Sequence, residues 1–352
     1  MGADADSGAI DAVAGFATHI ARRWRGRNDL GELIDNELWE LEEGLTSIGQ
    51  KARAEVYDVR TRLEADIGEL PLFEIAELAH AVVYIAGERW DRAVPRDSRY
   101  VFAGLATRAV ATMREIAILL EQGYAFGARS RWRTLSEILV VARVLTLGDR
   151  YTATRYKEHR WIMLRDQRRK TGYFQWTSDL PTPEVMARRL CRRFGVEYGG
   201  MYGWAARLSA RELGVAKPGW SHLKTLANVD EHETRVHDAH HSVHGADSLG
   251  LLGSVGAGFG TFHAGASSYQ VIPVARDSVR LFRQTMSAIF NSCTQFSDAR
   301  KPLILRGILD GHAFNLEQAL GWQVITEDGA QMAHYLSAMK SLFGDVLEVT
   351  EP

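Results

Sequence analysis

The sequence predicts an all-α protein, and three observations support this fold class. Proline breaks helix interiors, and its eight occurrences lie between long stretches that contain none. Within those stretches, apolar residues recur at spacings of three and four, which is the period of an amphipathic helix. Patterns that alternate like a β-strand are rare, with short candidates at 269–272 and 322–325. We therefore expect a helical bundle.

The predicted helices follow one another along the chain. The clearest pattern lies in residues 28–69, where apolar side chains recur at helical spacing: Leu30, Leu33, Ile34, Leu38, Leu41, Leu45 and Ile48. The same spacing predicts helices over 73–93, 98–122, 128–147, 276–296 and 329–343. Proline and polarity shifts near residues 95 and 298 predict three regions, which are an acidic N-terminal helical hairpin over 1–96, a central bundle over 97–297 and a C-terminal helical appendix over 298–352.

The composition excludes several classes of protein. The 352 residues carry a formal net charge of −2, which excludes a strongly basic nucleic-acid coat. Two cysteines, Cys191 and Cys293, are too few for a disulfide framework and lack metal-finger spacing, which favours a reducing compartment. No apolar run reaches the roughly 18 to 20 residues of a membrane span, and the acidic start of the chain is unlike a signal peptide. We expect a cytoplasmic protein with no membrane partner and no cofactor.

The near-neutral total conceals two oppositely charged regions. Residues 1–96 hold 19 acidic and 11 basic side chains, a balance of −8, whereas residues 127–194 hold 16 basic and 6 acidic ones, a balance of +10. The acidic N-terminal helices are candidates for homo-oligomerisation or for docking a partner. Six basic residues of the middle region are candidate RNA contacts: Arg129, Arg131, Arg165, Arg168, Arg169 and Lys170. Alternatively, these residues form solvated helix faces.

Arg133 and Glu137 lie four residues apart within the apolar segment 127–145. On a helix this spacing places them one turn apart on the same face, and the apolar surroundings predict that the pair is buried. Burying two charges costs desolvation energy, so such a pair is either an interior brace or part of a functional site.

A histidine cluster over 232–244 is the second unusual feature. His237 and His241 share a helix face, as do His240 and His244, and this spacing lets two imidazoles bind one metal ion. The glycine-rich stretch that follows, 245–265, contains a GxGxG core that could cradle phosphate. No predicted strand precedes it and no Lys-Ser or Lys-Thr follows it, so we expect a mobile loop there.

Arg235 and His240 are separated by four residues, as in an Arg-x4–6-His motif. This motif resembles the active-site signature of the HEPN (higher eukaryotes and prokaryotes nucleotide-binding) helical superfamily, and the resemblance implies metal-independent ribonuclease activity. The chemistry is consistent with these residue types. Histidine can accept the proton of a 2′-hydroxyl near neutral pH, and arginine can stabilise the pentacoordinate phosphate. The residue beside the arginine is Thr234, where asparagine is usual in that superfamily.

The order of motifs along the central region also resembles a bacterial family, domain of unknown function five-six-seven-seven. The matching segments, spread over residues 98–295, are LLEQGYAFGARSRWRTLSEILVVARVL, RYKEHRWIML, PGWSHLKTLA and HDAHHSVHG. The positions that carry the resemblance are Arg133, Glu137, Glu158, His159, Trp220, Ser221, Ser242, His244 and Gly245. The resemblance implies an α-helical domain and a site at these residues, but it implies no reaction.

Three functions remain open at this point. The first is a HEPN-like endoribonuclease or toxin in bacterial defence, with His244 as acid or base, Arg133 as phosphate stabiliser and Glu137 as the residue that orients either of them. Such a protein is expected to have an antitoxin or another defence partner. The second is a non-catalytic helical sensor or scaffold, in which Arg133 and Glu137 pin helices together and His244 caps a helix end. The third is a metal-dependent hydrolase that uses the histidine cluster.

Overall fold

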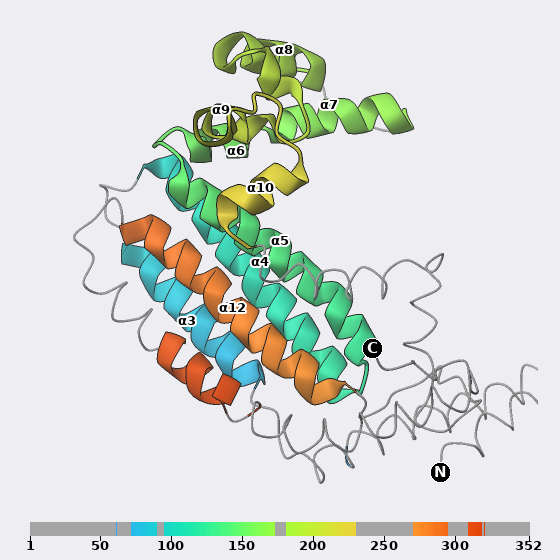
Figure 1. Cartoon of the computed structure of the whole chain (residues 1–352), viewed down its shortest axis with the longest axis vertical. Helices are drawn as coiled ribbons and strands as arrows, with labels where there is room; N and C mark the ends of the chain where they lie inside the picture. Colours follow the sequence, from blue (N-terminus) through green and yellow to red (C-terminus); the bar gives the residue numbers. More distant parts are fainter. Residues whose placement is uncertain are drawn as a thin grey trace, which may run out of the picture.

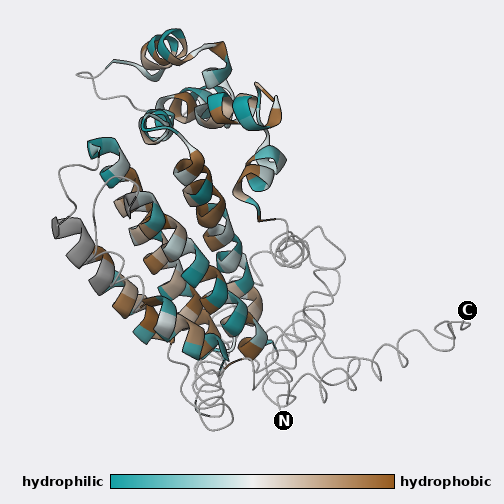
Figure 2. Ribbon diagram, turned by 60° about the vertical axis from the view of Figure 1, so that its left-hand side comes forward, coloured by the Kyte–Doolittle hydropathy of each residue, from teal (hydrophilic) through white to brown (hydrophobic). Residues whose placement is uncertain are grey.

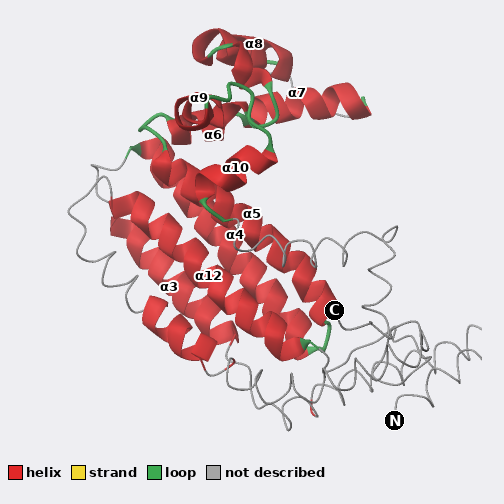
Figure 3. Ribbon diagram, in the orientation of Figure 1, coloured by secondary structure: helices red, strands yellow, loops and turns green. Residues whose placement is uncertain are grey.

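The computed structural model confirms the all-α fold class. It describes residues 61, 72–89, 95–172, 181–229, 270–294, 309–318 and 320, and these residues contain helices and no strand (Figure 3). Most of the predicted helix 28–69, all of the predicted helix 329–343 and the strand candidate 322–325 lie outside the described residues. The division into regions 1–96, 97–297 and 298–352 stays a prediction.

Four long helices form the body of the protein (Figure 1). They are α3 (Leu72–Arg89), α4 (Arg96–Glu121), α5 (Ala125–Leu147) and α12 (Val271–Thr294). Helix α4 packs against α3, α5 and α12, and α5 packs against α12. Each helix separates apolar from polar residues around its axis (Figure 2), and the apolar sides meet in one continuous core. Leu309, Ala313, Leu316 and Leu320 add the helical segment 309–318 and its continuation to the same core.

Buried polar contacts fix α5 against α12. The indole Nε1–H of Trp132 donates to the carbonyl oxygen of Asp277 over 3.2 Å. About four helical turns further along α5, the hydroxyls of Thr146 and Ser292 form a short hydrogen bond. The contacts lie near opposite ends of α5, so they fix both its register and its angle on α12.

The strand candidate at 269–272 is wrong for its described part, because Val271 and Ile272 form the first residues of α12. Gln270 precedes them with a left-handed φ of 64°. Pro273 follows within the first helical turn, where a backbone N–H has no intrahelical partner. The N–H that proline lacks therefore costs the helix no hydrogen bond. In an apolar run this short, the spacing of residues does not distinguish a strand from the start of a buried helix.

Short helices form a second layer at the end of the bundle where α4 begins and α5 ends (Figure 1). They are α6 (Thr152–Glu158), α7 (Arg160–Thr171), α8 (Pro183–Phe194), η1 (Val196–Gly199), η2 (Gly203–Ala205), α9 (Ala206–Leu213) and α10 (Trp220–Ala227). We call this layer, residues 151–172 and 181–229, the cap. Helix α10 packs against α5, and α6 packs against α4, so the cap rests on two helices of the bundle.

One glycine decides how the middle of the cap is packed. A Cβ atom on Gly203 would lie 2.3 Å from the carbonyl oxygen of Tyr198, a distance that real Cβ atoms do not reach. Gly203 therefore lets η2 approach η1 more closely than any other residue would allow. Its neighbours Tyr202 and Trp204 line the space between cap and bundle.

The core makes a direct prediction about stability. Replacing the fully buried Phe282 of α12 by alanine removes a large apolar side chain from a packed interior and should lower the free energy of unfolding by about 3–5 kcal/mol. Phe314 is 47% exposed and provides the matched control, since Phe314→Ala should cost less than half as much. Chemical denaturation of the two variants measures both values. Equal losses would contradict the burial difference.

Candidate functional site

A cavity of about 940 Å³ lies where the cap meets helices α4 and α5. Its walls come from segments that are far apart in the sequence, which are 100–108 on α4, 133–141 on α5, 156–163 on α6 and α7, 201–204 around η2, and 220–223 on α10. Pockets of roughly 300–1,000 Å³ are the usual size for small-molecule sites. The cavity therefore has room for a ligand as large as a nucleotide.

Cations dominate the charged residues of the cavity wall. Arg108 of α4, Arg133 of α5 and Arg160 of α7 all line it, together with Lys157 of α6. Among the described lining residues, Glu137 is the one carboxylate. An excess of positive charge in a concave site with partly apolar walls raises the local concentration of anions. The cavity is therefore suited to an anionic ligand.

Aromatic side chains form much of the cap side of the wall. Tyr156 and Trp204 meet edge to face with ring centroids 4.9 Å apart. Tyr202 and Trp220 are tilted by 36° with centroids 5.9 Å apart. All four line the cavity, with Tyr100 of α4 as a fifth aromatic residue. Flat π surfaces beside cations are the combination that binds a ring and a charged group in the same ligand.

Arg133 and Glu137 lie on the cavity wall and form an ion pair, with 3.4 Å between Nε and Oε1. The expectation that this pair is buried is wrong, because the side chains are 33% and 48% exposed. The physical reason is that the cap leaves this face of α5 open toward the cavity. An exposed pair at this spacing contributes only about 0.3–0.5 kcal/mol, so its contribution as a structural brace is small.

Tyr202 reaches the neighbourhood of this pair from the cap. Burial raises the pKa of the Tyr202 phenol, and the negative charge of Glu137 raises it further. The hydroxyl therefore stays protonated near neutral pH and can donate a hydrogen bond to a ligand or to the carboxylate. Burial likewise raises the pKa of Tyr156, although Arg108 opposes the effect.

His159 lines the cavity, but the fold uses its ring as a structural contact. Its Nε2 lies 2.8 Å from the carbonyl oxygen of Gly200, and its ring meets that of Tyr198 edge to face at 5.3 Å. A carbonyl oxygen can only accept, so Nε2 carries the proton. Burial lowers the pKa of His159, and this effect exceeds the opposing effect of the Gly200 carbonyl. The histidine is therefore neutral near pH 7 and ties α7 to the loop before η2.

Lys157 and Glu158 serve a second structural contact beside the cavity. Lys157 Nζ lies 2.5 Å from Oδ1 of Asp97, at the start of α4, and 3.2 Å from Oε1 of Glu158. Thr154 donates to the other oxygen of Asp97 over 2.8 Å. The hydrogen bond to Asp97 raises the pKa of Lys157, so this cation keeps its charge. These contacts fasten α6 to α4 at the edge of the site.

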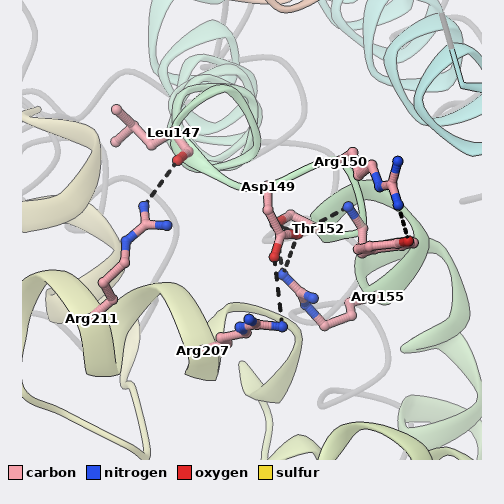
Figure 4. Close-up of polar contacts among 8 residues, drawn as sticks. Leu147, Asp149, Arg150, Thr152, Arg155, Arg207 and Arg211 are labelled. Carbon is pink, nitrogen blue, oxygen red and sulfur yellow. Dashed lines mark hydrogen bonds and ion pairs between the residues drawn. The ribbon is translucent and has the colours of Figure 1, made fainter.

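Asp149, in the turn between α5 and α6, connects the end of the bundle to the cap (Figure 4). Its Oδ1 accepts hydrogen bonds from Thr152 Oγ1 (3.1 Å), from the backbone N–H of Tyr151 (2.9 Å) and from Arg155 Nη2 (2.9 Å). Arg207 of α9 approaches Oδ2 at 3.9 Å. Burial raises the pKa of Asp149, but the charge of Arg155 and these hydrogen bonds outweigh it and hold the pKa below its ordinary value. A charged Asp149 therefore joins α5, α6 and α9.

The six predicted RNA contacts occupy two separate places. Arg129 and Arg131 lie near the start of α5, where Arg129 Nη2 donates to Gln270 and Arg131 pairs with Glu115. The other four lie on α7 in the cap, at the opposite end of the bundle (Figure 1). Arg165 donates to Asp166 and to the Gly199 carbonyl, Arg168 pairs with Glu184, and Arg169 and Lys170 are exposed.

Several predicted site residues lie outside the described residues: His244, Arg235, His240, His237, His241, Ser242 and Gly245. The same is true of the rest of the glycine-rich stretch 245–265. The described chain ends at Val229, directly after α10, and resumes at Gln270, directly before α12. Within the described ranges, no three His, Cys, Asp or Glu side chains gather in a way that could hold a metal ion.

The central region of the chain matches the model of a known family. Residues 99–250 match the model of DUF5677, a family of unknown function. The matched range begins in α4 and contains every described residue that lines the cavity, from Tyr100 to Leu223. The resemblance to this family is therefore confirmed for 99–250, whereas the resemblance to the HEPN superfamily stays a prediction. No curated protein and no solved structure matches the chain.

The structure brings together four of the positions that carried the family resemblance. Arg133, Glu137, His159 and Trp220 all line the cavity, whereas Glu158 and Ser221 do not. Other lining residues were not predicted from the sequence, above all Arg108, Tyr156, Arg160, Tyr202 and Trp204. One signal for Tyr202 and Trp204 was present, since tyrosine and tryptophan are interspersed with glycine over residues 198–204. Among the described helices, none has the combined length and apolar character needed to cross a membrane.

The Asp149 contacts lead to a stability prediction. Asp149→Asn keeps an oxygen acceptor but leaves the charge of Arg155, 7% exposed, without its anion. We expect a loss of about 1–3 kcal/mol in the free energy of unfolding, measured by denaturation, because losing hydrogen bonds to a buried charged group has this cost. The control is Glu212→Gln, which removes an exposed partner of Arg211 and should change stability by at most about 0.5 kcal/mol. A loss of stability in Asp149→Asn as small as that in Glu212→Gln would contradict this role of Asp149.

His159 leads to a prediction about pH. Its folded pKa is below the ordinary value of 6.5, so the unfolded chain binds more protons than the folded chain as the pH falls through this value. Its contribution to stability is complete above about pH 6.5 and is lost on acidification below it. Thermal unfolding from pH 7.5 to 5 should therefore show a smaller acid loss for His159→Gln than for the wild type. The same acid loss in both proteins would show that His159 is not buried in its neutral form.

Proposed function

We propose that the protein binds single-stranded RNA in the cavity between cap and bundle and cleaves it without a metal ion, as a HEPN-like endoribonuclease. The observation that supports this proposal is the lining of the cavity. Arginines from α4, α5 and α7 surround the same space as the aromatic pairs Tyr156–Trp204 and Tyr202–Trp220.

Both parts of a nucleotide find matching groups in this lining. Phosphate oxygens are acceptors that guanidinium groups bind through two parallel hydrogen bonds. Unpaired bases stack on tyrosine and tryptophan rings, and each such contact contributes about 1–3 kcal/mol. Bases within a duplex are already stacked on one another and cannot enter such a cavity. The aromatic walls therefore favour a single-stranded substrate.

The proposed reaction is an internal transfer at one phosphodiester. A base removes the proton of the 2′-hydroxyl, the 2′-oxygen forms a bond to phosphorus, and the bond to the 5′-oxygen breaks. The leaving oxygen takes up a proton, which gives a 2′,3′-cyclic phosphate and a 5′-hydroxyl. Arg133 stabilises the extra negative charge on the phosphate, and Glu137 holds the guanidinium in place.

The acid and base in this proposal come from the histidine-rich segment. His244 is the first candidate, with Arg235 and His240 as an alternative pair, because imidazole exchanges protons near neutral pH. Val229, 4% exposed at the end of α10, fixes the point where this segment leaves the cap, directly after the helix that carries Trp220. A ribonuclease of this kind would act as a toxin or in antiviral defence, together with an antitoxin or another defence partner.

A specific observation favours a second candidate, which is a non-catalytic sensor that binds a nucleotide. Among the described lining residues, His159 is the one imidazole, and its Nε2 is engaged with the Gly200 carbonyl. The described part of the cavity thus contains groups that can bind a nucleotide, and Glu137 is its one carboxylate that could accept a proton. In a sensor, the ligand would change how the cap sits on the bundle.

An RNA-cleavage assay separates these functions. We expect the purified protein to cleave a single-stranded RNA in the presence of EDTA, and Arg133→Ala to lower the rate by about 10²–10³-fold, as the loss of a group that stabilises an oxyanion does. His244→Ala should lower it by a similar or larger factor while RNA binding is retained. Mass spectrometry of the products should show the 2′,3′-cyclic phosphate.

The control variant is Arg114→Ala. Arg114 lies on α4 outside the cavity and pairs with Glu77, so its loss should leave cleavage unchanged. RNA that is bound in the cavity but not cleaved would favour the sensor. A protein that neither binds nor cleaves RNA would contradict both functions. Loss of cleavage on adding EDTA would favour the metal-dependent hydrolase.

A further inference from the structure

Helix α8 presents a strongly basic face that the cavity does not use. Its buried side contains Pro183, Ala187 and Leu190, with Cys191 and Phe194 packed partly against the core. The opposite side carries four arginines, all exposed: Arg188, Arg189, Arg192 and Arg193. We call these four residues the arginine face. The helix is thus amphipathic, and its outer side is cationic without interruption over its last two turns.

The arginine face has no counter-charge within the described residues. No ion pair joins any of its four guanidinium groups to a described carboxylate, and the one further contact is Arg193 above the ring of Phe194 at 5.0 Å. Arg188 and Arg192 are four residues apart, as are Arg189 and Arg193. Like charges at this spacing repel each other on a helix surface and destabilise it by a few tenths of a kcal/mol per pair, about 0.2–0.5.

The stability of α8 alone explains only part of this arrangement. Arg192 and Arg193 lie in the last helical turn, where cations interact favourably with the helix dipole. Arg188 and Arg189 lie in the middle of the helix, beyond the reach of that effect. Their charges add repulsion and gain no described partner, which is the pattern expected of a surface that binds an external anion.

Helix α7 connects the arginine face with the cavity. Arg168 near the end of α7 pairs with Glu184 near the start of α8, so the two packed helices run antiparallel. Along α7, Arg160, Met163, Gln167 and Lys170 follow at helical spacing and are all exposed. The first two line the cavity, and the last lies one turn beyond Gln167 toward the α8 end of the helix pair. Because the helices run antiparallel, the last turn of α8 lies beside the start of α7: the ring of Tyr198 contacts both Phe194 (centroids 5.0 Å apart) and His159 (5.3 Å). The end of α8 that carries Arg192 and Arg193 therefore lies near the cavity end of α7.

We infer that the arginine face, together with Arg169 and Lys170 of α7, binds the phosphate backbone of a single-stranded RNA whose bases enter the cavity. This inference rests on the proposed function, since it names the path that the substrate takes outside the cavity. The occupant is RNA because the arginine face begins near the end of α7 that lines a site with base-stacking walls. The arginine face extends over residues 188–193, about 9 Å along the axis of α8, and its long side chains can reach successive phosphates.

Salt-dependent binding tests this inference. The variants are Arg188→Gln with Arg189→Gln, and Arg192→Gln with Arg193→Gln, each measured with a 15-nucleotide single-stranded RNA over a range of salt concentrations. Each lost phosphate contact lowers the slope of log K against log salt by about 0.7 for single strands, so each double variant should lose about 1.4 from the slope. The affinity near 0.15 M salt should fall about tenfold.

A dinucleotide separates the arginine face from the cavity. It fills only the cavity, so both double variants should cleave or bind it as the wild type does. The charge-matched control is Arg114→Gln with Arg280→Gln, which removes two paired arginines away from α8 and should leave the slope unchanged. Thermal unfolding should show equal or higher stability for Arg188→Gln with Arg189→Gln, because repulsion is removed and neither residue lies in the last turn.

Each result has a defined meaning. An unchanged slope in both α8 variants, with RNA still bound in the cavity, overturns the inference and leaves the proposed function standing. A wild-type protein that binds no RNA overturns both. If the α8 variants instead lose binding to vesicles of anionic phospholipid and keep the full RNA slope, the arginine face binds a lipid surface and the inference is wrong.

Discussion

The carboxylate of Asp149 is a principal link between the bundle and the cap that covers its end. It is the point at which α5 ends and the chain turns into the cap, and it holds α6 through Arg155 and Thr152 while Arg207 approaches it from α9. Arg155 is almost fully buried, and a buried guanidinium without its anion is strongly unfavourable. The orientation of the first part of the cap therefore depends on this charge, together with the Lys157–Asp97 contact of α6 and the packing of α10 on α5.

The second constraint is that the cavity has two walls of different kinds. The bundle side supplies arginines and Glu137 from long helices that the core holds rigidly. The cap side supplies four aromatic rings, together with Lys157 and Arg160, from short elements that pack through Gly203 and the Gly200 carbonyl. Charged groups on a rigid scaffold and stacking groups on a smaller layer form a site whose shape follows the packing between the layers.

The sequence was sufficient for the long helices and insufficient for the cap. Residues 98–122 and 128–147 were predicted as helices and form α4 (Arg96–Glu121) and α5 (Ala125–Leu147), since their apolar period is sustained over many turns. Helices α9 and α10 have eight residues each, which is too short for a period to be distinctive. Arg133, Glu137 and Trp220 were predicted site residues and share a cavity, but their exposure depends on how the cap covers α5, which no local pattern contains.

The two-layer cavity also affects how the protein would respond to any occupant. Any opening of the cap away from the bundle would separate the two walls of the cavity. A molecule that touches Arg133 on one side and Trp220 on the other binds only while the layers are closed. Its binding energy is then added to the free energy of cap opening, as thermodynamic linkage requires. The occupancy of the cavity and the local stability of α6 to α10 are thus thermodynamically coupled, so that a change in one changes the other.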